Sequence, residues 1–304
     1  MKNHERILKL TAVSMFEKIY YAFEYFKYLK NPISCLLFKF GFKKSVTVRL
    51  KNNLELDLNE IKLLDHFMST LKLVTNNKIG GYVDYFSNVD FDSKTVIVNG
   101  IEIINPTKCP LNSVFHEYFF DYYDDFDINY DGKVIIDIGS HAGDSALFFA
   151  SKGAVIYGFE PVKELYNLSL KNIKLNLELS PNINIFNLGV SYKKGKIKID
   201  SMDSVSSYIN ERSQYDVEIL DINDIINKFH PNLLKMDCEG CEFSIILNSD
   251  LSKFDEIIFE QHAKMVGKDF ELLEKRLKEQ GFNIKVHTVY DEKINDLALV
   301  YAYK

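Results

Sequence analysis

The second half of the chain alternates apolar segments with amphipathic ones, and this alternation limits the fold more than any other feature. Five nearly continuous apolar runs, among them KVIIDIG, AVIYGFE and NLLKMD, are separated by segments with helical spacing. Strands that are apolar on both faces are typical of a mostly parallel sheet covered by helices on both sides. Two last runs, NIKVHTVY and DLALVYAY, are predicted to complete the sheet as an antiparallel pair.

The first third of the chain has a different character. SVTVRLKNNLELDL and KTVIVNGIEII alternate in the manner of hairpins, and EIKLLDHFMSTLKLV has helical spacing. We therefore expect an N-terminal α+β region over residues 1–130, with a packing or acceptor-binding role. The larger α/β domain is expected over residues 131–304.

Composition excludes several functional classes. The 304 residues carry a net charge of -6, with a pI near 5.7, which argues against a nucleic-acid binder. Four scattered cysteines are no secreted disulfide framework, so a cytoplasmic location is expected. The longest apolar run, ISCLLF, is far shorter than the roughly 20 residues of a membrane span.

The N-terminal segment MFEKIYYAFEYFKYLKNPISCLLFKFGFKK is rich in aromatic residues and lysines. Two structures fit this composition: a basic amphipathic helix on a membrane surface, or a helix that packs its aromatic face on the rest of the fold. The second is favoured, and peripheral membrane contact stays open.

A turn rich in glycine follows the first apolar strand of the α/β domain. Its form is D-x-G-x-x-x-G, from Asp137 through Gly139 to Gly143. A dinucleotide turn needs glycine where this chain has His141, and an acid at the strand end repels phosphate. S-adenosylmethionine (SAM) has no phosphate, and its ammonium and sulfonium groups are cationic. The turn therefore favours SAM over NAD, although similar turns also occur without a ligand.

Glu160 ends the next strand, 23 residues after Asp137. An acid at this place grips ribose hydroxyls in related folds, whereas the simpler alternative is a surface acid that caps the following helix. Two acids at adjacent strand ends favour the binding site. The predicted cofactor-binding residues are Asp137, Gly139, Ser140, His141, Gly143, Asp144, Glu160 and Pro161.

Further polar residues follow the fourth and fifth strands. Asp237 and Glu239 come after NLLKM, and Glu260 and His262 end EIIFEQH. Because neighbouring parallel strands end at the same edge, these four are predicted to converge as catalytic residues. A hydroxyl acceptor must lose its proton, either to a base such as His262 or with help from a metal. The base is favoured and no metal is predicted, although Asp237, Glu260 and His262 are also suitable ligands.

Cys238 and Cys241 lie in the same segment. A zinc site needs further ligands at metal spacing, and no second C-x-x-C exists. We therefore expect two small buried residues that behave as hydrophobic ones. Glu242, next in the chain, is expected to be an acid in the first turn of a helix.

Residues 132–282 resemble the FkbM-type family of SAM-dependent methyltransferases. The resemblance is carried, in family order, by VIIDIGSHAGDSALFF, GFEPVKELYNLSLKNIKLN, LLKMDCEGCE, FEQH and a late Gly-Phe. LLKMDCEGCE, similar to the family's LKIDVEGAE, is the most specific piece. Two departures are Ser140-His141, where Ala-Asn is common, and the two cysteines, where small apolar residues are usual.

The resemblance implies a Rossmann-like class I methyltransferase sheet and methylation of a hydroxyl on a sugar, glycan or natural product. The expected cofactor is SAM and the expected partner is a small-molecule or glycan acceptor, with no nucleic acid. A nicotinamide-dependent oxidoreductase and a SAM-binding module without turnover are the alternatives. On the sequence alone, Asp137→Ala and Glu160→Ala are expected to abolish SAM binding and leave the fold intact.

Overall fold

The computed structural model describes residues 23, 25–51, 55–58, 61, 64, 68, 89–91, 95–98, 100–104, 126–200, 214–287 and 298–304. Contacts between Cα atoms divide the chain into two units. The first is Met1–Gly100 with Asn105–Phe120, and the second is Ile101–Ile104 with Asp121–Lys304. The division falls near residue 120, and the assignment of domains to residues 1–130 and 131–304 stays a prediction.

The first unit contains a helix and two antiparallel strand pairs. Its elements are α2 (Pro32–Lys39), β1 (Val46–Arg49), β2 (Glu55–Leu58), β3 (Val89–Phe91) and β4 (Thr95–Val98). Asn31, just before α2, donates to the carbonyl of Thr47 at 2.7 Å and accepts from the amide of Arg49 at 2.9 Å. These bonds fix the helix to β1. The predicted hairpin turn at Asn52-Asn53 lies outside the described residues, as does most of the helix predicted after it.

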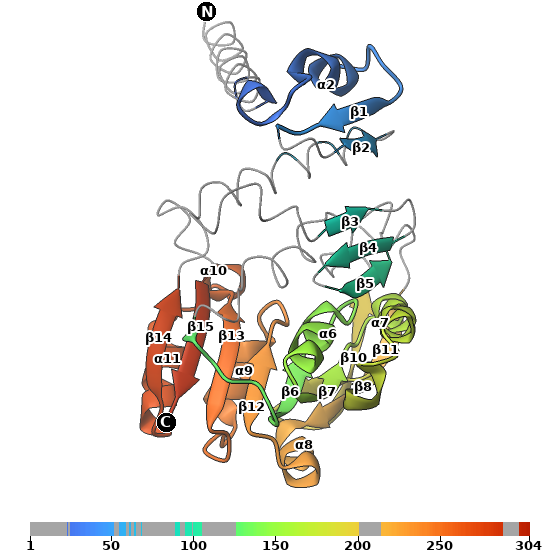
Figure 1. The fold of residues 1–304 in the computed structure, drawn as a ribbon. Coiled ribbons are helices and arrows are strands. Elements are labelled where there is room, and N and C mark those ends of the chain that lie inside the picture. The colour runs from blue at the N-terminus through green and yellow to red at the C-terminus, as the bar shows by residue number, and fades with distance from the viewer. Residues whose placement is uncertain are drawn as a thin grey trace, which may run out of the picture. The chain divides into compact units, whose positions relative to one another are not determined.

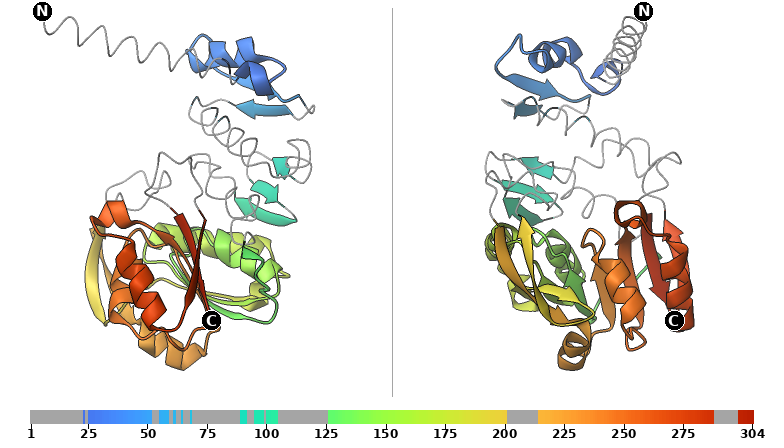
Figure 2. Two further views of the ribbon diagram at one scale, coloured as in Figure 1. Left: turned by 90° about the vertical axis from the view of Figure 1, so that its left-hand side faces the viewer. Right: turned by 180° about the vertical axis from the view of Figure 1, so that it is seen from behind.

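The second unit is built on a seven-stranded sheet with the order β14-β15-β13-β12-β6-β7-β8, which can be followed from left to right in Figure 1. The strands are β6 (Val134–Ile138), β7 (Val155–Phe159), β8 (Ile183–Phe186), β12 (Leu233–Met236), β13 (Glu256–Gln261), β14 (Asn283–His287) and β15 (Ala298–Tyr303). Only β15 runs against its neighbours among these strands. Figure 2 shows the sheet from the side that carries β14 and from behind. The predicted α/β architecture is confirmed.

Helices follow most of the parallel strands, as predicted. They are α6 (Asp144–Ser151), α7 (Lys163–Leu175), α8 (Ile222–Phe229), α9 (Cys241–Asn248), α10 (Ala263–Val266) and α11 (Glu271–Glu279), with a short 3-10 turn, η2 (Ser180–Asn182). Local chemistry sets several ends: the Asp221 side chain caps α8 by accepting from the amide of Asn223, and Gly153 and Gly281 adopt positive φ just after α6 and α11.

Side chains alternate between the two faces of the central strands. Ile138 and Met236 belong to a core with residues of α8, α9 and α11. Asp137 and Lys235 point to the opposite face, where Ser145 of α6 contacts both. The two faces are therefore covered by different helices, and a charged pair lies inside the layer between the sheet and α6.

Two features of the second unit were not predicted. A small sheet with the order β10-β11-β9 combines β9 (Gly189–Ser191), β10 (Gly195–Asp200) and β11 (Gln214–Asp221). The third predicted strand is divided between β8 and β9 at Asn187, whose side chain donates to the carbonyls of Glu160 and Pro161. The polar segment between β10 and β11, residues 201–213, lies outside the described residues.

β5 (Ile101–Ile104) is grouped with the second unit. The backbone amides of Glu102 and Ile104 donate to the side chains of Asn176 and Asn172, at 2.8 and 2.9 Å. Both asparagines are buried, one inside α7 and one just after it. None of the described helices is both long and apolar enough to cross a membrane.

Candidate functional site

The turn between β6 and α6 is held between two neighbouring strands. The amides of Gly139 and Ser140 donate to the carbonyl of Phe159, at the end of β7, at 2.9 and 3.2 Å. A Cβ on Gly139 would meet the carbonyl oxygen of Asp237, beyond β12, at 1.8 Å. Positive φ angles at Gly139, His141 and Gly143 complete the bend. Glycine at 139 is therefore required both by conformation and by the close approach of another backbone.

Asp137 is fully buried and its charge is balanced. Its carboxylate accepts from the hydroxyl of Ser145 at 2.6 Å and pairs with Lys235 Nζ at 3.0 Å. The two residues are register partners on β6 and β12. Lys235 also donates to the carbonyl of Gly139 at 3.0 Å. Asp137 therefore orders the turn through Lys235 and Ser145.

This geometry changes the expected effect of Asp137→Ala. Removal of the Asp137 carboxylate leaves Lys235 buried without its counter-charge, and an uncompensated buried charge destabilises a fold by several kcal/mol. An alanine at 137 is thus expected to affect folding as well as cofactor binding.

Glu160 connects the turn to the end of β7. Its side chain is 4% exposed, and its carboxylate accepts from the amides of His141 at 2.9 Å and Val162 at 2.7 Å. Burial raises the pKa of Glu160 to about 7, against the lowering effect of His141 and these bonds. Because Val162 is the N-cap of α7, Glu160 serves the helix start and the glycine turn together.

The turn carries its own polar groups. The hydroxyl of Ser140 is fully buried, and no hydrogen-bond partner for it exists among the described residues. His141 Nδ1 lies 3.8 Å from an oxygen of Asp144, in the first turn of α6. Burial lowers the pKa of His141, but the hydrogen bond and charge of Asp144 outweigh it and raise the pKa. The turn therefore places a buried hydroxyl and an imidazole beside the amides at the start of α6.

His262, at the end of β13, is held by two carboxylates. Its Nδ1 lies 3.0 Å from Oε1 of Glu242, and its Nε2 lies 3.5 Å from Glu239. Glu242 is fully buried, and its other oxygen accepts from the amide of Gly240 at 3.0 Å. Glu242 thus fixes the imidazole ring with Nε2 turned to Glu239.

The charges around His262 are mostly negative. Burial lowers its pKa, but the bond and charge of Glu242 outweigh this, and the charges of Asp237 and Glu260 add to them. The resulting pKa is about 9, so the free protein holds His262 protonated at neutral pH. Burial, with the charges of Asp237 and Glu242, also raises the pKa of Glu239.

The four predicted catalytic residues lie in one cluster. Ligand atoms of Asp237, Glu260 and His262 are within 4.8 Å of one another, in a geometry that could hold a metal ion. Glu239 reaches the same histidine, and the charge of His141 acts on Glu239. The cluster after β12 and β13 is therefore next to the glycine turn.

Sequence reasoning missed two of the residues that organise this region. Lys235 is a lysine inside the apolar run LLKM, and a buried lysine requires a counter-charge. This was a usable signal for its pairing with Asp137. Glu242 was expected to be only an acid in the first turn of α9, and the sequence does not show that it contacts His262, 20 residues later in the chain.

The cysteine pair differs from expectation. Cys238 and Cys241 are joined by a disulfide and are half-buried, rather than two independent buried residues. The disulfide closes the turn that contains Glu239 and Gly240, both with positive φ. A Cβ on Gly240 would lie 2.4 Å from a methyl of Val266, in α10. The bonded turn thus packs on the segment that follows His262.

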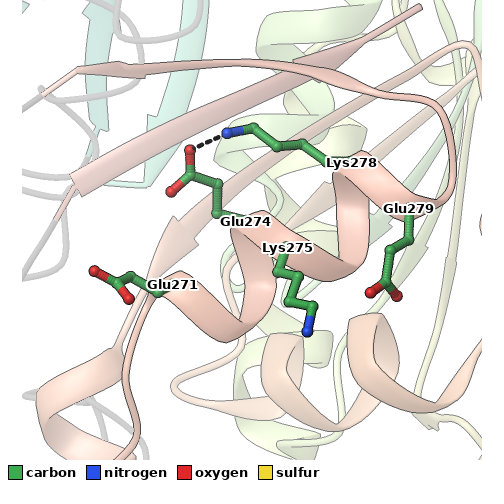
Figure 3. Close-up of a pocket in the computed structure, with 5 residues that line it drawn as sticks. All are labelled: Glu271, Glu274, Lys275, Lys278 and Glu279. Carbon is green, nitrogen blue, oxygen red and sulfur yellow. Dashed lines mark hydrogen bonds and ion pairs between the residues drawn. The ribbon is translucent and has the colours of Figure 1, made fainter.

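A hollow beside α11 contains none of these residues. It is lined by charged side chains, Glu271, Glu274, Lys275, Lys278 and Glu279, shown in Figure 3. Glu274 and Lys278 form an ion pair at 2.6 Å with the spacing that supports a helix. Glu271 and Glu274 at the start of α11 and Lys278 near its end suit the helix dipole, and Glu279 at its end pairs with Arg276 at 3.6 Å.

Comparison with known families identifies the second unit. Residues 137–284 match the family model described as the methyltransferase FkbM domain. This part of the chain is an FkbM methyltransferase domain. The match begins at Asp137 of the glycine turn and extends past the His262 cluster into β14, so it includes every predicted site residue. A sequence search of curated proteins finds no match.

Several solved structures are similar to this chain. A methyltransferase FkbM from Methylobacillus flagellatus KT has 18% identity and a TM-score of 0.42, over 57% of this chain and 44% of that one. Magnesium protoporphyrin IX methyltransferase from Synechocystis PCC 6803, solved with SAM, has 12% identity and a TM-score of 0.41, over 77% and 97%. TrmK of M. capricolum, solved with S-adenosylhomocysteine, has 14% identity and a TM-score of 0.39, over 61% and 68%. At these scores the similarities carry no weight for acceptor or site residues.

Proposed function

We propose that this FkbM domain uses SAM to methylate a hydroxyl group on a small-molecule or glycan acceptor. The observation that carries the proposal is the adjacency of two structures: the glycine turn, with its buried Ser140 hydroxyl and the amides that start α6, and a cluster of carboxylates around His262. A methyltransferase needs these two parts side by side, because the acceptor must be aligned with the methyl group.

The residues of the turn fit SAM on several grounds. The buried hydroxyl of Ser140, without a partner among the described residues, is suited to a polar group of a ligand. Amides at the start of α6 suit a carboxylate. The Glu160 carboxylate is the natural partner of ribose hydroxyls, and Asp137 positions the turn from behind. When bound, SAM supplies an activated methyl group.

His262 is proposed to receive the acceptor's proton at Nε2. Glu242 holds Nδ1 on the other side of the ring, which fixes the tautomer and stabilises the imidazolium. With a pKa of about 9 in the free protein, the deprotonated fraction of His262 is small at neutral pH and grows about tenfold per pH unit up to that value. Glu239, 3.5 Å from Nε2, is placed to pass the proton to solvent.

A divalent cation is the second candidate for hydroxyl activation. It is favoured by one observation, the convergence of Asp237, Glu260 and His262 ligand atoms within 4.8 Å. The two carboxylates suit Mg²⁺ or Mn²⁺, whereas the imidazole suits Zn²⁺ or Fe²⁺. Enzyme treated with EDTA distinguishes the two: a base predicts unchanged turnover, and a cation predicts turnover that returns only with added metal.

The proposal is tested by transfer of a labelled methyl group from SAM to a panel of polyols, sugars and amines. We expect label on hydroxyl-bearing acceptors with the wild-type chain and with Glu271→Gln, a control on the exposed start of α11. His262→Gln is expected to bind SAM and transfer slowly. Transfer only to amines removes the hydroxyl assignment, and SAM binding without transfer to any acceptor favours a binding module.

A further inference from the structure

Exposed large apolar side chains concentrate in one short segment of the first unit. Six of the thirteen found among the described residues lie between positions 23 and 42. They are Phe23, Phe26, Ile33, Leu37, Phe40 and Phe42, with exposed fractions from 39% to 77%. Single exposed apolar residues are ordinary, but a group of this size within 20 residues marks an interaction surface.

The segment has a second apolar face that is already packed. Tyr25, Tyr28 and Leu29 are buried, as are Cys35 and Phe38 of α2. One face of this segment, which includes aromatic rings, is therefore buried.

The outer face of α2 is also apolar. Ile33, Leu37 and Phe40 follow one another at spacings of four and three, so they share one side of the helix and its end. Because one apolar side of α2 is already buried, the second, exposed apolar side is available to a partner.

Charge indicates the nature of that partner. Residues 23–44 contain five lysines, at 27, 30, 39, 43 and 44, and one acid, Glu24. This local excess of positive charge occurs in a chain whose total is -6. Lys43 and Lys44 are exposed and directly follow Phe42, the most exposed of the six apolar residues.

We propose that Phe23 and residues 25–44 form a docking surface for an anionic lipid membrane. Phenylalanines beside lysines are the composition of interfacial helices, in which the rings enter the boundary with the acyl chains and the lysines contact lipid phosphates. The chain lies on the bilayer, consistent with the lack of a membrane-spanning helix among the described residues. This inference is independent of the proposed methyl transfer.

Flotation of the full chain with vesicles tests the proposal. Vesicles of phosphatidylcholine with about 30% phosphatidylserine are compared with phosphatidylcholine alone, at low and high salt. We expect binding to the anionic vesicles to exceed binding to neutral ones about tenfold or more, and to weaken with salt.

Two variants and a matched control locate the surface. Phe40→Ser with Phe42→Ser, and separately Lys43→Glu with Lys44→Glu, are each expected to reduce flotation about tenfold. Leu177→Ser, which replaces a 73% exposed leucine in the second unit, should float as wild type. Circular dichroism checks that each variant is folded.

Two results overturn the proposal. One is flotation that is absent, or that both double variants leave unchanged. The other concerns the oligomeric state, measured by size-exclusion chromatography. If the wild type is a dimer, and Phe40→Ser with Phe42→Ser makes it a monomer without reducing flotation, the surface binds a second copy of the chain.

Discussion

The turns after β6 and β12 both follow a buried strand that leads to an aspartate, yet they treat charge in opposite ways. Asp137 is sealed from solvent and matched by one lysine, Lys235. After β12, Asp237, Glu239 and Glu242 gather with Glu260 around a single imidazole. The first turn is therefore electrostatically balanced, whereas the second retains an excess of negative charge.

This difference indicates that the two turns have different roles, one structural and one chemical. The buried pair of Asp137 and Lys235 holds the backbone of the turn, through the bond from Lys235 to the carbonyl of Gly139. Excess negative charge raises the pKa of His262, whereas burial, with the charges of Asp237 and Glu242, raises the pKa of Glu239. Such shifts are typical of functional sites. On this basis we expect the β6 turn to bind the cofactor and the β12 turn to carry out proton transfer.

The largest effect is expected from Lys235→Met. The variant leaves Asp137 buried and uncompensated, which should reduce the free energy of unfolding by about 3–5 kcal/mol, measured by urea denaturation. Adding Asp137→Asn should recover most of the loss, because the pair is then neutral on both sides. A loss below about 1 kcal/mol in the single variant would show that the pair is not the balanced scaffold described.

Next in size is the effect of His262→Gln on turnover. Removal of a general base lowers kcat by about 10²–10⁴, while SAM affinity should stay close to wild type. In the wild type, kcat should rise with pH, reach half of its maximum near pH 9, the pKa of His262, and level off above that pH. Glu242→Gln should move this midpoint to lower pH, since it removes the negative charge that raises the pKa of His262. A profile unaffected by either variant excludes His262 as the base.

Glu160 gives a prediction about stability and pH. Its folded pKa of about 7 lies above the ordinary value of 4.5, so the folded state binds this proton more tightly than the unfolded state. The corresponding stability is present below about pH 4.5 and is lost as pH rises to about 7, by about 3 kcal/mol. Urea midpoints at pH 5 and pH 8 measure it. Glu160→Gln should remove this part of the slope, and an unchanged slope contradicts the assignment.

The smallest effect concerns the disulfide. Cys238 and Cys241 close a loop of only four residues, for which loop entropy gives about 2 kcal/mol. Cys238→Ser with Cys241→Ser should cost no more than this, and should lower kcat modestly because Glu239 is less well held near His262. Free Cys35 is far from this turn in sequence, so Cys35→Ser is the control. Equal kcat in both variants shows that the disulfide does not position Glu239.

Much of the fold could be predicted because strand and helix periodicity in this half of the chain agrees with local end signals, such as Gly153 after α6. The glycine turn, Glu160 and the cluster around His262 were also predictable, because parallel strands end at one edge. Pairings across the sheet were harder: the contact of Glu242 with His262 depends on the packing of α9 against β13. The disulfide depends on the bend at Glu239-Gly240, which sequence spacing does not reveal.

Calorimetric titration of the protein with SAM and with NAD at pH 8 tests the central claim most directly. The account predicts that SAM binds and NAD does not, that Glu160→Gln weakens SAM binding about tenfold or more, and that Glu279→Gln on α11 does not. Binding of NAD, or equal SAM affinity in wild type and Glu160→Gln, would contradict the assignment of the β6 turn as the cofactor seat.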